Sequence, residues 1–120
     1  MSSEHLSQTI KDRRILREAY TLCRMIIFNL RSFLDVEDYG YLKKACELAE
    51  YASSKIDYLE NMHGFRDLYN NLKDLRNQLE SKSWKLTEEE YGRISEQVTY
   101  TIVRANIIAM GLNFKLKRMK

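Results

Sequence analysis

Side chains that could perform catalysis are scarce in this chain of 120 residues. It has two histidines, His5 and His63, too few to favour a triad in which a histidine works between two further groups. Glu60 and His63 have the Glu-x-x-His spacing of the metal ligands in di-iron helix bundles. Such a site needs a second motif and two more carboxylates. We therefore interpret residues 60–63 as a solvated turn and predict no metal site.

Phosphate and magnesium sites have equally little support. The four glycines are isolated, at positions 40, 64, 92 and 111, so the chain has no glycine-rich phosphate loop. The acidic run at residues 88–90 could bind magnesium, but acidic residues in the first turn of a helix are ordinarily explained by capping and the helix dipole. We predict no catalytic residue and no cofactor.

The two cysteines, Cys23 and Cys46, both lie in apolar helical patterns. A disulfide between neighbouring helices is possible from this spacing. Two buried thiols are the simpler interpretation, because an unpaired cysteine behaves as a small hydrophobic residue.

Basic residues form the most regular polar pattern in the chain. At about 100° per residue, four arginines of the first helix lie within roughly 40° of one another. A second row follows the last helix, and the C-terminal tail adds to it. The candidate binding residues are Arg13, Arg17, Arg24 and Arg31 in the first row, Arg93, Arg104, Lys115 and Arg118 in the second, and Lys117 in the tail.

These rows are candidates for binding the backbone of RNA or DNA. The arginine guanidinium group donates two hydrogen bonds at once to a phosphate, and such contacts do not read sequence. If the first and last helices are neighbours, the two rows could merge into one basic ridge. The alternative is that they are ordinary solvated helix faces, since Glu18 and Glu96 lie near them.

Four helices are expected to carry these side chains. The chain has no proline, and apolar residues recur at spacings of three and four over most of its length. We predict helices over residues 3–34, over a segment ending at 59, over 65–81, and from 88 onward. The expected breaks are residues 35–40, with Asp35 or Asp38 as the cap of the second helix, then 61–64, and a loop at 81–86.

The last helix has the clearest beginning. Thr87 and Glu90 fit a capping box, and Leu86 and Tyr91 are placed as its hydrophobic staple. Gly64 is a candidate for a left-handed residue after the second helix. Short connections between four helices predict an all-α, antiparallel up-down four-helix bundle, a single domain covering residues 1–120.

Size and composition favour a cytoplasmic protein. The net charge is +3, and 44% of the residues are hydrophobic, enough for a real core. The longest apolar run covers residues 25–28, far too short to span a membrane. The first residues lack the basic and apolar segments of a signal peptide.

The second half of the chain resembles a known family. It has a leucine-rich helix at residues 65–79, the segment Leu-Thr-Glu-Glu-Glu-Tyr at 86–91, and a long final helix. These features are similar to the last two helices of the four-helix-bundle family of the rRNA intervening-sequence protein and Avd, the accessory variability determinant of diversity-generating retroelements. The Arg-Ala-Ala/Ser-Ile-Asn-Ile-Ala-Glu-Gly segment of that family is absent, and residues 41–56 occupy its place. Within this family, Avd is the closer comparison.

The resemblance implies a non-enzymatic accessory protein. Avd-like proteins are homopentamers with basic surfaces that bind nucleic acid and a reverse transcriptase. It implies a homo-oligomer here, such as a pentamer, with the basic rows holding nucleic acid or the polymerase. The alternative is a small helical protein-binding module with no nucleic-acid role, such as an immunity protein, a phage-encoded inhibitor or a subunit of a larger complex.

Overall fold

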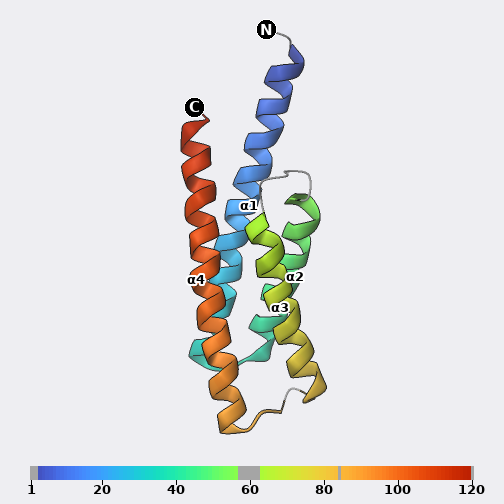
Figure 1. The fold of residues 1–120 in the computed structure, drawn as a ribbon, viewed down its shortest axis with the longest axis vertical. Helices are drawn as coiled ribbons and strands as arrows, with labels where there is room; N and C mark the ends of the chain where they lie inside the picture. Colours follow the sequence, from blue (N-terminus) through green and yellow to red (C-terminus); the bar gives the residue numbers. More distant parts are fainter. Residues whose placement is uncertain (1–2, 57–62, 84, 120) are drawn as a thin grey trace.

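A computed structural model describes residues 3–56, 63–83 and 85–119 of the chain. These residues form four helices: α1 (Ser3–Val36), α2 (Tyr39–Ile56), α3 (His63–Ser81) and α4 (Glu88–Arg118). Helix α1 packs against α2 and α4, and α3 packs against the same two helices, so the helices surround one core in chain order (Figure 1). The predicted all-α, up-down four-helix bundle is confirmed, and α1 and α4 are neighbours.

The connection between α1 and α2 is short, and an aspartate in it caps α2. Helix α1 continues two residues beyond the predicted Leu34. It ends at Val36, and the next residue, Glu37, has a positive φ of 55° and donates its backbone N–H to the Phe33 carbonyl at 2.8 Å. The Asp38 carboxylate then accepts the backbone N–H of Gly40 at 2.8 Å, so Asp38, rather than Asp35, caps α2.

Gly64 differs from its predicted role. The expected break at residues 61–64 lies partly outside the described residues, as do Leu59 and Glu60, but α3 already includes Gly64. No described glycine has a positive φ, so the left-handed assignment was wrong. Instead, a Cβ at position 64 would lie 3.1 Å from Cγ1 of Ile108 in α4. Glycine is present here because the start of α3 comes very close to α4.

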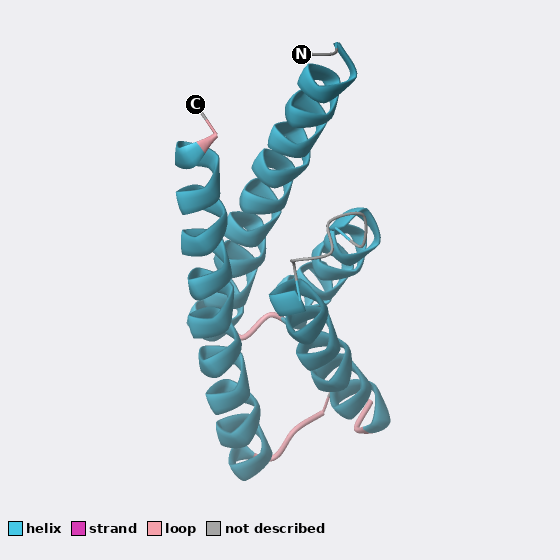
Figure 2. Cartoon of the chain, turned by 45° about the horizontal axis from the view of Figure 1, so that its top comes forward, coloured by secondary structure: helices cyan, strands magenta, loops and turns pink. Residues whose placement is uncertain are grey.

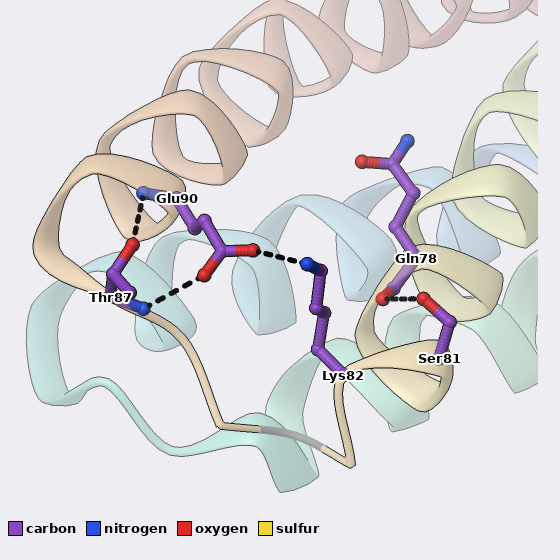
Figure 3. A network of polar contacts seen from close by, with 5 residues as sticks. All are labelled: Gln78, Ser81, Lys82, Thr87 and Glu90. Atoms are coloured by element: carbon purple, nitrogen blue, oxygen red, sulfur yellow. Dashed lines mark hydrogen bonds and ion pairs between the residues drawn. The ribbon is translucent and has the colours of Figure 1, made fainter.

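The beginning of α4 is built as predicted (Figure 3). The Thr87 hydroxyl accepts the Glu90 backbone N–H at 3.1 Å, and the Glu90 carboxylate accepts the Thr87 backbone N–H at 3.2 Å. Lys82, at the end of the preceding turn, lies 3.1 Å from the same carboxylate. Leu86 and Tyr91, the predicted staple residues, are both half-buried against the core. Trp84, in the same loop, lies outside the described residues.

The core is aliphatic with few aromatic residues. The buried core draws on all four helices, including the leucine series of α3; Ile15 of α1 and Leu116 of α4 are only half-buried. Cys23 and Cys46 are buried free thiols, which confirms the simpler interpretation. Burial raises the pKa of Cys23 to about 12 and that of Cys46 to about 11. Both thiols are therefore protonated at neutral pH.

The first and last helices are longer than the two between them in the chain. Helices α1 and α4 have 34 and 31 residues, whereas α2 and α3 have 18 and 19. Their ends project past α2 and α3 on the side of the chain termini (Figures 1 and 2). Among the described residues, no helix is long and apolar enough to cross a membrane.

Candidate interaction surface

The four arginines of the predicted α1 row divide into one that is anchored to α4 and three that are exposed. Arg13 is half-buried and donates a hydrogen bond to the backbone carbonyl of Met119, so it ties α1 to the end of α4. Arg17, Arg24 and Arg31 are exposed. None of these three forms an ion pair with a described residue. They follow one line along α1 and remain available to an anionic partner.

The basic row of α4 faces α3 instead of α1. The Arg104 guanidinium is 3.5 Å from the carboxylate of Asp67 in α3. It also lies over the Tyr100 ring, 5.7 Å from the centroid, and donates to the Tyr100 hydroxyl. Arg93 lines a cleft between α3 and α4, close to Gln78. This row is therefore partly engaged within the bundle.

The remaining basic residues of the last turns are divided between the two flanks of α4. By helical rotation, Lys115 and Arg118 lie on the flank of Arg93 and Arg104, whereas Lys117 lies on the opposite flank, toward α1. The Arg118 guanidinium is 5.6 Å from the centroid of the Phe114 ring. Lys115, Lys117 and Arg118 are all exposed.

The two rows do not form the continuous ridge that the sequence suggested. Arg13 contacts α4 on the side where α1 lies, while Arg104 contacts α3 on the other side. Between these flanks lies the solvent-facing side of α4. The rotational spacing of each row was read correctly from the sequence. The side of each helix on which its neighbours pack is a tertiary feature that spacing alone does not determine.

An apolar stripe runs along this solvent-facing side of α4. We call it the outer stripe. Its members recur at alternating spacings of three and four, as in the contact face of a coiled coil, and each is between 51% and 72% exposed. They are Tyr100, Val103, Ile107, Met110 and Phe114.

Our sequence interpretation missed the outer stripe because it assigned one apolar face to α4. The core uses Ile94, Val98, Ile102, Ala105 and others on the opposite face. The signal was present: the second half of α4 has apolar residues on two faces. A helix with one buried stripe ordinarily has charged and polar residues on its other side.

A cleft between α3 and α4 continues from the outer stripe. It has a volume of about 350 Å³ and is lined by both polar and apolar side chains, among them Asp74, Leu75, Glu96 and Tyr100. Tyr100 belongs to both features. The outer stripe is thus bordered on its α3 side by a groove with a polar rim.

The described residues contain no group of three or more histidine, cysteine, aspartate or glutamate side chains placed to hold a metal ion. The side chains of Glu60 and His63 lie outside the part of the chain that the structure describes.

Comparisons with known proteins give no further guidance. No protein-family profile, no curated protein and no solved structure matches the chain.

Proposed function

We propose that this chain is a non-enzymatic, protein-binding helical bundle whose partner contacts the outward face of α4. The observation that supports this most directly is the outer stripe. Five large apolar side chains are exposed in one continuous line, whereas isolated exposed apolar residues are normal on any protein. Exposed apolar patches with a polar border are typical of protein–protein contact sites.

The remainder of the bundle suits such a role. The core and the capping box make α4 a rigid platform, because the capping box fixes its start and its inner face packs against α1 and α3. The bordering cleft adds carboxylates and amides that can fix the orientation of a partner. Interfaces of this type combine an apolar centre with a polar rim.

The test is a binding experiment with one stripe variant and one matched control. Ile107→Lys replaces the central residue of the stripe, which is 63% exposed. Ile10→Lys makes the same replacement on α1, at a residue that is 61% exposed. Affinity capture from nuclease-treated extract of the native cells identifies a candidate partner. The purified partner is then titrated against the wild-type protein, Ile107→Lys and Ile10→Lys.

We expect the wild-type protein and Ile10→Lys to bind the purified partner with the same affinity, and Ile107→Lys to bind at least tenfold more weakly. Circular dichroism checks that both variants keep the helical fold. Equal affinity for Ile107→Lys and wild type would refute the assignment of the stripe as the binding surface.

A second candidate function rests on the free arginines of α1. We propose nucleic-acid backbone binding by Arg17, Arg24 and Arg31, which are exposed and lack ion-pair partners among the described residues. Under this proposal the family resemblance supplies the context: the protein would bind RNA or DNA with α1 and a reverse transcriptase with α4. The two proposals concern different surfaces, and each can stand alone.

Salt dependence tests the second candidate. Three phosphate contacts give a slope of about −2 to −3 in a plot of log affinity against log salt. Replacing the three arginines with glutamine should abolish that slope. The control replaces Lys44, Lys73 and Lys85, three exposed lysines elsewhere, with glutamine. If both triple variants weaken binding equally, the effect comes from net charge and the α1 site is refuted.

A further inference from the structure

The outer stripe has the geometry of one half of a helix pair. Residues 100, 103, 107, 110 and 114 correspond to two heptads with alternating contact positions. A second helix that carries the same spacing would insert its side chains between those of α4. Helix α4 of a second copy of the chain carries this same spacing.

We propose that two copies of this chain associate through their outer stripes, with the two α4 helices antiparallel. This inference rests on the proposed protein-binding function of the stripe and names its partner. The contact is isologous, so the same five side chains of each copy meet one another about a two-fold axis near Ile107.

The charges along α4 select the antiparallel orientation. Residues 88–96 contain four glutamates and one arginine, whereas residues 97–118 contain Arg104, Lys115, Lys117 and Arg118 and no acidic residue. A parallel pair would place the two basic ends side by side. An antiparallel pair centred on the stripe places Glu96 of each copy near the last basic turn of the other. Opposite charges beside a helix contact fix the orientation of its partner.

The area of the stripe is sufficient for a specific contact. A fully exposed aromatic side chain presents about 150–250 Å². With half to three quarters of each side chain exposed, the five together present on the order of 500 Å². Two copies would then bury about 1,000 Å², near the lower limit for a specific interface. We therefore expect a dimer that dissociates on dilution.

The flanks of the stripe are compatible with close helix contact. On one flank, Asn106 is half-buried and its side chain donates to the Ile102 carbonyl at 3.2 Å, so it brings no charge to the interface. On the other flank, Gly111 has nothing within 4 Å of the position of a Cβ and leaves room for a long side chain of the partner. Arg104 is the one charged residue beside the centre, and Asp67 and Tyr100 hold it against its own bundle.

Sedimentation equilibrium over a concentration series tests the association. We expect wild type and Ile10→Lys to reach twice the chain mass of 14.3 kDa, and Ile107→Lys to remain at that mass. A wild-type protein that stays monomeric throughout would overturn the dimer. So would an Ile107→Lys variant that still dimerises.

Cysteine cross-linking tests the orientation. In an antiparallel pair, residue 100 of one copy lies near residue 114 of the other, and the two residues at position 100 are roughly 20 Å apart along the axis. A mixture of Tyr100→Cys and Phe114→Cys should therefore form a disulfide-linked heterodimer, and Tyr100→Cys alone should not cross-link. Self-linkage of Tyr100→Cys would overturn the antiparallel arrangement. Wild type serves as the control, because Cys23 and Cys46 are buried.

The second-copy inference and the proposed protein-binding function fail in different ways. A monomeric wild-type protein that still requires Ile107 for binding another protein would refute the second-copy inference and leave the protein-binding function intact. A purified partner that binds Ile107→Lys as well as wild type would refute the protein-binding function at this surface.

Discussion

Removing the N-cap hydroxyl of α4 gives a direct test of how the bundle is held together. Thr87 accepts the Glu90 backbone N–H at 3.1 Å and donates its own N–H to the Glu90 carboxylate at 3.2 Å. The variant Thr87→Ala loses the first of these bonds and leaves one N–H at the helix start without its side-chain acceptor. Replacing an N-cap threonine with alanine costs about 1 kcal/mol.

The expected loss is global because α4 packs against both α1 and α3. A small single domain of this kind unfolds cooperatively, so a weaker start of α4 lowers the free energy of unfolding of the whole bundle. For a chain of this size, 1 kcal/mol corresponds to a fall in Tm of roughly 3–5 °C. Circular dichroism at 222 nm measures the free energy of unfolding in a urea titration and Tm in a thermal melt.

Two control variants isolate the cap. Thr87→Ser keeps the hydroxyl and should stay within a few tenths of a kcal/mol of wild type. Thr21→Ala makes the same change as Thr87→Ala at an exposed position inside α1, where alanine is the better helix former, and should raise stability by up to about 0.5 kcal/mol. If Thr87→Ala is as stable as Thr87→Ser, the cap contributes nothing and this account of α4 is refuted.

Three further predictions follow from single contacts. The hydrogen bond from the Thr87 backbone and the contact with Lys82 lower the pKa of Glu90 below its ordinary value of 4.5. The stabilisation from its charge is therefore present above pH 4.5 and is lost as the pH falls through the lower folded-state pKa. The stability difference between wild type and Glu90→Gln should shrink toward zero as the pH falls below 4.5, and a constant difference would contradict this. Gly64→Ala should be less favourable in the wild-type background than beside Ile108→Ala, which removes the facing atoms, with a coupling of about 0.5–1 kcal/mol in a double-mutant cycle; additive effects would contradict the contact. Cys23 and Cys46 should react with iodoacetamide only as fast as the protein opens, because burial raises their pKa to about 12 and about 11; rapid labelling in native buffer would contradict their burial.

Much of the fold could be predicted from local patterns. The spacing of apolar residues located α1, α3 and α4 to within about two residues at each described end. The capping box of α4 was predicted from two side chains, Thr87 and Glu90, because both of its hydrogen bonds are made within four consecutive residues. Such features depend on chain geometry over one turn, and the sequence contains everything that determines them.

Contacts between helices were less accessible. Gly64 was interpreted through its own backbone freedom, whereas its role depends on Ile108, which is distant in sequence. Arg104 was placed in a ridge shared with α1, whereas Asp67 draws it toward α3. In both cases the local pattern was compatible with several neighbours. The order of the helices around the core decides which neighbouring helix each side chain contacts.

The surface of α4 shows which kinds of exposed residue carry information about function. Charged residues on a solvated helix face stabilise the free protein in water, so a row of arginines arises in helices with no ligand at all. A row of five exposed apolar side chains has no such benefit and favours association. The outer stripe is therefore the stronger indication of a partner. The arginines of α1 become informative only if their removal changes the salt dependence of binding, which an ordinary solvated face would not do.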